Sequence, residues 1–332
     1  MKKLLSLAFA LVLSNTGIHA EGIPESYNHV DQVLWVVSDV ENTMAQYREL
    51  GFNQIRDLGQ VEMISGTTGD VGQIRLVCAN LGGAHVNWIE PLGENSIFYN
   101  FLEENGEGAM SLVHRFSAQE ELRKEMGRLW DLGLKFLDKV TFQTSEGDMV
   151  FALLDTYREG KYYLGFTFGE SGLKIHDSLG AENRNNMKLN QYAFAIRDPE
   201  PVSEFWQKIG LPPFEISYPE LGNPKYYGKP ADHELIQGWQ RHGSITYEWC
   251  IPVEPPIVYE DHIKKHGEGI HHLAYLVNDM DKVLKDYTSR GFIVSMGGTW
   301  GEVGKSGSGR YEYIDLDKAG GLTMELLWSY KE

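Results

Sequence analysis

The sequence is poor in cysteine and has no cluster of positive charge. Cysteine occurs twice among 332 residues, at Cys78 and Cys250, inside strand-like runs in different halves of the chain. Two such distant residues exclude a disulfide framework and argue against a single bridge. Lysine and arginine total 30 against 47 aspartate and glutamate, giving a net charge of −17, and no basic run occurs. This charge balance is typical of proteins that do not bind nucleic acid, so we expect none as a partner.

Long apolar runs are also missing, apart from one near the amino terminus. Lys2 and Lys3 precede the apolar run Leu4–Leu13, and Ala20 offers a small residue for cleavage. A membrane-spanning helix needs about 17 to 25 apolar residues, so this run is too short to be an anchor. We interpret residues 1–20 as a secretory signal peptide, which predicts export to a bacterial periplasm and no membrane span in the mature chain.

Glycine is frequent, and its spacing reveals an internal repeat. Four segments share a strand-like run, a helical stretch that ends in glycine, and further strand-like runs; these glycines are Gly51, Gly133, Gly210 and Gly291. The first two lie 82 residues apart and the last two 81 residues apart. The residue after a helix is commonly left-handed, a conformation that glycine adopts without strain. Paired modules of this length predict domains at residues 27–169 and 188–329, joined by a polar linker at 170–187.

Three stretches give this repeat a family resemblance: Asn190–Ile196, Gly267–Tyr275 and Met324–Leu327. With them the chain resembles the vicinal oxygen chelate superfamily, which includes glyoxalase I, methylmalonyl-CoA epimerase, bleomycin-resistance proteins and extradiol dioxygenases. The resemblance implies an α+β fold of four βαβββ modules forming two tandem domains. It also implies that each pair of modules closes into a cup of eight strands, with a metal on the inner face. Tyr227–Ala231 looks most like the glyoxalase and epimerase branch.

The superfamily's ligand positions match four residues of the carboxyl-terminal half: Gln191, Glu248, His272 and Glu325. Side chains alternate along a strand, so we expect His271 and His272 to point to opposite faces, and the resemblance selects His272. Two carboxylates in this set balance a divalent cation. Mixed nitrogen and oxygen ligands suit zinc, nickel, cobalt, iron or manganese, and the sequence does not choose among them.

The amino-terminal half has no such ligand set. The matching positions hold no carboxylate and no imidazole; they are Gln32, Asn87, Ser111 and Gly165. We therefore expect no transition metal in this half, and we interpret it as a structural domain or as a lid or binding surface for the other.

The resemblance implies a glyoxalase-like or epimerase-like lyase or isomerase that moves a proton next to a carbonyl through a metal-stabilised enediolate. Glu325 is the first candidate for the base and Glu248 the second. Lys305, Arg310 and Tyr227 are weaker candidates for contacts with a small carbonyl substrate. A non-catalytic binding protein on the same fold is the main alternative. An extradiol-type dioxygenase ranks lower, because those iron enzymes have histidine where this chain has Gln191.

Overall fold

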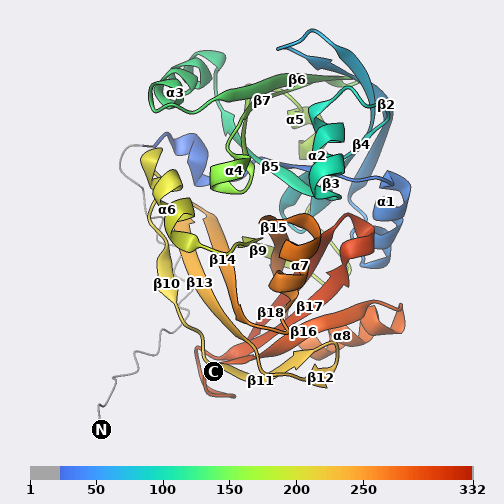
Figure 1. Ribbon diagram of the computed structural model, residues 1–332. Helices are drawn as coiled ribbons and strands as arrows, with labels where there is room; N and C mark the ends of the chain where they lie inside the picture. The colour runs from blue at the N-terminus through green and yellow to red at the C-terminus, as the bar shows by residue number, and fades with distance from the viewer. Residues whose placement is uncertain (1–22, 331–332) are drawn as a thin grey trace.

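The computed structural model of the chain describes residues 23–330, and Figure 1 shows two domains stacked one above the other. The stretch interpreted above as a signal peptide, residues 1–20, lies outside the described residues. Within the described part, no helix is long and apolar enough to cross a membrane. Cys78 and Cys250 are buried free thiols in different domains, as expected.

The amino-terminal domain is a closed eight-stranded barrel, with α1 and α3 packed on its outer face. Its strands follow the order β1-β4-β3-β2-β6-β7-β8-β5 around the barrel. Strand β1 lies parallel to β4 and antiparallel to β5, which joins the two modules. The elements are η1 (Glu25–Asn28), β1 (Gln32–Val36), α1 (Val40–Glu49), β2 (Ile55–Ser65), β3 (Val71–Leu81), β4 (Ala84–Pro91), α2 (Ile97–Asn105), β5 (Gly108–Phe116), α3 (Gln119–Asp131), β6 (Phe136–Thr144), β7 (Gly147–Leu154), α4 (Tyr157–Gly160) and β8 (Tyr163–Phe168).

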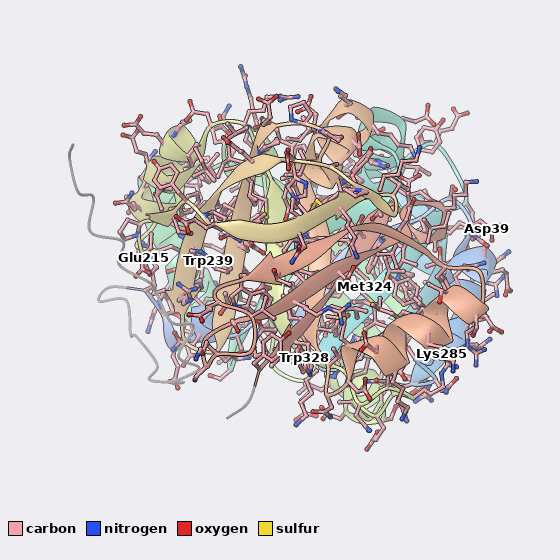
Figure 2. The ribbon with its side chains drawn as sticks, turned by 90° about the horizontal axis from the view of Figure 1, so that it is seen from below. Asp39, Glu215, Trp239, Lys285, Met324 and Trp328 are labelled. Carbon is pink, nitrogen blue, oxygen red and sulfur yellow. The ribbon has the colours of Figure 1, made fainter. Side chains whose placement is uncertain are left out.

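The carboxyl-terminal domain repeats this plan as an open, curled sheet of ten strands, in the order β10-β13-β14-β9-β15-β18-β17-β16-β11-β12. Figure 2 views this sheet from below, with Lys285 marking α8 and Glu215 and Trp239 marking the paired strands β10 and β13. The elements are β9 (Lys188–Ala195), α6 (Pro199–Lys208), β10 (Glu215–Ser217), β11 (Leu221–Tyr226), β12 (Lys229–Pro230), β13 (Glu234–His242), β14 (Ile245–Glu254), α7 (Val258–His266), β15 (Gly269–Leu276), α8 (Met280–Ser289), β16 (Ile293–Trp300), β17 (Gly309–Leu316), η2 (Asp317–Ala319) and β18 (Leu322–Ser329).

The two sheets differ where the cup should close. In the barrel, the continuous strand β2 pairs with both β3 and β6. Its counterpart in the second domain is split: β10 pairs with β13, whereas β11 pairs with β16. Pro219 lies between the two pieces, and a proline supplies no N–H for a strand ladder. The expected eight-stranded cup is therefore closed only in the amino-terminal domain.

Local sequence signals fix the helix ends in both domains. Asp39 and Asp279 precede α1 and α8, and their carboxylates accept hydrogen bonds from the backbone N–H groups three residues on. Gly51 and Gly291 follow the same helices at φ of +96° and +90°. The repeated glycine thus has the left-handed backbone that its position requires.

The segment 170–187, expected to be a linker, carries α5 (Leu173–Asp177). Ile175 and His176 of this helix are buried, and Ile175 packs into the interior of the barrel. The domains also share one apolar core across their interface. There the indole of Trp35 donates to the backbone oxygen of Gly320 at 2.6 Å, and that of Trp206 to Gly160 at 3.1 Å. The two domains thus bury their contact faces together.

Candidate metal centre

Four buried polar side chains meet on the three central strands and β18 of the carboxyl-terminal sheet. Ala193 on β9 is paired with both Glu248 on β14 and His272 on β15. Ala274 on β15 is paired in the same way with Gln191 and Glu325. Because paired residues on neighbouring strands lie side by side, two small alanines bring the four larger side chains together. Each of the four is at most 5% exposed, so this polar cluster is shielded from solvent.

The distances within the cluster leave one position where a cation fits. The Nε2 atom of His272 lies 3.3 Å from Oε2 of Glu325 and 3.7 Å from Oε2 of Glu248. Candidate ligand atoms of these three residues all lie within 4.8 Å of one another. Within the described residues, His272 Nε2 is a buried nitrogen without a hydrogen-bond partner. A buried imidazole nitrogen that faces two carboxylates fits a divalent metal ion.

Gln191 holds the two carboxylates together. Its Nε2 donates to Oε2 of Glu248 at 2.6 Å and contacts Oε2 of Glu325 at 3.3 Å. Rotation of the amide about its last bond exchanges Nε2 for Oε1, so the same residue can present an oxygen ligand to a cation. Its position therefore suits both the metal-free and the metal-bound cluster.

The electrostatics of the cluster call for positive charge. Burial, reinforced by the like charge of Glu248, raises the pKa of Glu325 above its ordinary value, and the contact with His272 only partly offsets this. Burial disfavours a charged imidazole, but the close approach of both glutamates to Nε2 outweighs it and raises the pKa of His272 to about 9. The two buried carboxylates thus favour the protonated form of His272 in the metal-free protein. A bound metal ion would supply the positive charge instead of this proton.

Several neighbours of the cluster escaped the sequence analysis. Gln237 on β13 donates to the other oxygen of Glu248 at 2.6 Å. The hydroxyls of Tyr259 and Tyr313 lie 2.6 Å apart, and both residues pack with Cys250 in the interior of the cup. Strand alternation could have identified Gln237, because buried Leu235 lies two residues earlier on the same face.

One expectation about the histidine pair is wrong. His271 and His272 do not point to opposite faces: their Nδ1 atoms lie 2.7 Å apart and their ring centroids 4.9 Å apart. The register of β15 against β9 shifts between Ile270 and His272, so His271 is the extra residue of a β-bulge. A bulge interrupts the alternation of side chains on which the expectation rested. Of the two histidines, only His272 belongs to the group of candidate ligands.

The residues expected to contact substrate do not join this cluster. Lys305 is exposed on the loop between β16 and β17. Arg310 forms ion pairs with Asp281 of α8 at 2.7 Å and with Glu312 at 3.0 Å. Tyr227 is 44% exposed, and its hydroxyl donates to Asp315 at 3.2 Å. A surface cavity of about 620 Å³ lies elsewhere, between α4 and α6, and none of the four cluster residues lines it.

The matching positions of the amino-terminal barrel lie in the same register but have different contents. Leu34 is paired with both Asn87 and Ser111, as Ala193 is with Glu248 and His272. Asn87 donates to Gln32 at 2.9 Å, and its Oδ1 lies 3.2 Å from Nε2 of His176, which α5 inserts from outside the strands. A neutral amide network fills the place that the cluster has in the second domain.

Comparisons with known proteins agree with this two-domain arrangement. Residues 190–310 match the family described as the Glyoxalase/Bleomycin resistance/Dioxygenase superfamily, a stretch that includes Gln191, Glu248 and His272 and ends before Glu325. No curated protein sequence matches the chain. The carboxyl-terminal domain belongs to this superfamily, also called the vicinal oxygen chelate superfamily, and the whole chain has its two-domain fold.

Solved structures share the fold at low sequence identity. A triple mutant of 4-hydroxymandelate synthase from Streptomyces coelicolor has a TM-score of 0.61 and 15% identity, covering 90% of this chain and 92% of its own. The Mn(II)-bound glyoxalase from Novosphingobium aromaticivorans has a TM-score of 0.48 and 13% identity, covering 92% and 83%. A catechol 2,3-dioxygenase has a TM-score of 0.46 and 11% identity, covering 91% and 93%. At 15% identity the likeness to the synthase shows a shared fold and does not indicate the reaction. The other two structures are too dissimilar to support a conclusion about this chain.

Proposed function

We propose that the carboxyl-terminal domain holds one divalent metal ion and catalyses proton transfer next to a carbonyl, as a lyase or isomerase of the glyoxalase and epimerase type. The observation that carries the proposal is the donor set. It consists of two carboxylates, one imidazole and one amide, all buried around one point; the residues are Gln191, Glu248, His272 and Glu325. The charge of the two glutamates balances a divalent ion, and mixed oxygen and nitrogen donors suit zinc, nickel, cobalt, iron or manganese.

When bound, the metal would polarise a carbonyl oxygen of the substrate as a Lewis acid. The two glutamates differ in their hydrogen bonds, and this difference assigns one of them the role of ligand and the other that of base. Both oxygens of Glu248 accept short hydrogen bonds, from Gln191 and Gln237 at 2.6 Å each, so this carboxylate is fixed as a ligand. Glu325 accepts one longer hydrogen bond, from Gln191 at 3.3 Å, beside its 3.3 Å approach to His272, and burial raises its pKa. A carboxylate with a raised pKa is a better general base, so Glu325 is the residue that removes and returns the proton.

An iron-dependent dioxygenase is the competing enzyme on this fold. Non-haem iron oxygenases characteristically use two histidines and one carboxylate, with open positions for oxygen and substrate. This cluster presents one histidine and two carboxylates, because His271 is turned toward the ring of His272. The donor set therefore favours proton transfer over oxygen activation.

The substrate we propose is a small carbonyl compound. The signal-peptide interpretation of residues 1–20 places the protein outside the cytoplasm, where coenzyme A thioesters and glutathione adducts are scarce. This export step is part of the proposal, and the mass of the protein recovered from a periplasmic extract tests it. A mature chain that begins near residue 21 supports export, whereas a full-length cytoplasmic chain contradicts it.

The metal and the base are tested together by Glu325→Gln. We expect the wild-type protein to bind one divalent ion per chain and to exchange the α-proton of small 2-oxo or 2-hydroxy compounds with deuterated solvent. Glu325→Gln should weaken metal binding at least 10-fold and abolish the exchange. Glu312→Gln is the matched control, because Glu312 is also a buried glutamate of this domain but pairs with Arg310 outside the cluster.

Two results would decide against the proposed proton-transfer enzyme. Absence of stoichiometric metal in the wild type, together with an unaltered Glu325→Gln protein, would leave the non-catalytic binding protein as the better interpretation. Consumption of oxygen by the iron-loaded protein, without solvent exchange, would favour the dioxygenase.

A further inference from the structure

We infer that His271 is a positioning residue for the metal ligand His272, and that the amino-terminal domain helps to hold this pair through His262 and His266. The inference rests on the proposed metal site and deepens it. It assigns a role to a histidine that is not itself a candidate ligand, and a second role to the domain that lacks ligands.

The first step is the hydrogen bond between the two neighbouring rings. The Nδ1 atoms of His271 and His272 are 2.7 Å apart, so one of them carries a hydrogen and the other accepts it. Nε2 of His272 faces Glu248 and Glu325, and it must offer a lone pair in order to bind a metal. The hydrogen of a neutral His272 then lies on Nδ1 and is donated to Nδ1 of His271. Such an outer hydrogen bond fixes the tautomer and the ring orientation of a metal-binding histidine.

The second step is the way in which His271 is held. Its side chain is buried, with the ring of Tyr259 at 5.1 Å and that of His262 at 5.0 Å between centroids, both nearly perpendicular to it. The bulge that places His271 is a property of the fold, because β5 has the same register shift against β1 at Met110. The bulge is thus present in both domains, whereas the imidazole is present only beside the candidate metal ligands.

The third step leads from His271 to the domain interface. The ring of His262 lies 5.0 Å from that of His266 on α7. Nδ1 of His266 contacts the backbone oxygen of Asn105 in the amino-terminal domain at 3.0 Å, and its Nε2 contacts Asp317 at 2.9 Å. A small gap between the domains is lined in part by Asn105, Tyr157, His262 and His266. Four histidines therefore form a continuous packed series from the cluster to a backbone oxygen of the other domain.

The test measures metal affinity by competition with a chelator, and the visible absorption spectrum of the cobalt-loaded protein. His271→Met introduces the residue found at the matching bulge and removes the acceptor, so the dissociation constant should rise about 10- to 100-fold and the cobalt spectrum should change. His271→Gln supplies an amide oxygen as acceptor and should restore most of the affinity. His266→Leu, at the interface end of the series, should raise the dissociation constant by about 2- to 30-fold.

His85→Met is the matched control, because His85 packs on His176 at the same 4.9 Å separation but away from the cluster. It should leave metal affinity and spectrum unchanged. Wild-type affinity and spectrum in a folded His271→Met protein would overturn the inference while leaving the proposed function intact. If His271→Met does not fold, failure of His271→Gln to bind more tightly than His271→Ala overturns it instead. Absence of metal binding by the wild type would overturn both the proposed function and this inference.

Discussion

The two domains place the same backbone register around very different interiors. The barrel encloses a large apolar cluster drawn from its strands, α2 and α5, and its four matching positions hold two amides, a serine and a glycine. The interior of the carboxyl-terminal cup has fewer apolar side chains, several of them tyrosines, next to two buried glutamates and a histidine. Burying such charge is costly without a counter-charge, whereas burying the apolar side chains of the barrel is favourable. Burial therefore favours folding throughout the barrel, whereas in the other domain part of that stabilisation offsets the cost of a buried polar cluster.

The closing strand differs in the same direction. The barrel is sealed by the continuous strand β2, whereas the second sheet is left open between β10 and β11. The interior of the barrel is filled and its sheet is closed, whereas the cluster of the second domain lies on a sheet whose ends do not join. Three changes test this difference between the two domains.

The largest effect should come from emptying part of the barrel. Phe142 on β6 is fully buried, with the rings of Phe98 and Phe151 within 5.6 Å between centroids. Phe142→Ala leaves a cavity among these rings, so the free energy of unfolding should fall by about 3–5 kcal/mol. Urea denaturation of the metal-free protein measures this loss.

Phe136→Ala is the control, because Phe136 lies on the same strand but is 39% exposed, and its loss should cost less than about 1 kcal/mol. Phe142→Ala should also leave the metal content of the folded protein unchanged. A variant that folds but loses its metal would show that packing inside the barrel also supports metal binding in the other domain.

A smaller loss of stability is expected from a change at Gly165, the position of the barrel that matches Glu325. A Cβ atom built on Gly165 would lie 2.6 Å from Oγ of Ser111 and 2.9 Å from Cγ2 of Val113. Gly165→Ala should therefore strain the barrel and lower its stability by about 1–3 kcal/mol. Gly127→Ala is the control, since its new Cβ meets nothing within 4 Å in the interior of α3, and alanine should stabilise the helix by about 0.5–1 kcal/mol.

Thermal unfolding of both glycine variants compares the two positions directly. A stable Gly165→Ala protein would mean that the barrel has room at the position of the missing carboxylate. In that case the absence of a ligand there would reflect the residue types alone and not the packing around them.

Much of this comparison could be predicted from the sequence, because it follows from spacing along the chain. The glycine repeat defines the modules, and the residues at matching positions show that only one half has carboxylates. Strand alternation could also have excluded Arg310 from the interior, since Tyr311 and Tyr313 of the same strand both point inward. Pro219 was a further visible signal, in this case for the broken strand.

What could not be predicted depends on pairing between distant segments. The bulge at His271 is a shift in register between β15 and β9, so the sequence of either strand alone gives no sign of it. The insertion of His176 beside Asn87 depends on how a segment with the composition of a linker folds back onto the barrel. Both features arise from packing in three dimensions, which a periodicity along one strand does not describe.

The smallest effect per residue should appear on acidification, where two buried histidines of the barrel and His272 of the cluster respond in opposite directions. In the barrel, burial lowers the pKa of His114 to about 4 and that of His176 to about 3. The unfolded chain takes up these protons below about pH 6.5 while the folded protein does not, so stability should fall as the pH drops from 6.5 toward 4. His272 behaves conversely in the metal-free protein. Because its folded pKa is raised to about 9, it contributes stability below pH 6.5 and loses that contribution as the pH rises to 9.

Urea midpoints of the metal-free protein at pH 6.5 and 5 measure the acid side of this comparison. We expect a loss of about 1–2 kcal/mol between these values for each buried neutral histidine. Nδ1 of His114 lies 2.8 Å from the backbone oxygen of His29. In His114→Gln the glutamine retains a donor for this oxygen but does not titrate, so the variant should lose less stability between the two pH values than the wild type, by the contribution of one histidine. An unchanged pH dependence in this variant would show that His114 becomes protonated without unfolding the barrel, and that its site beside Tyr27 is accessible to protons from solvent.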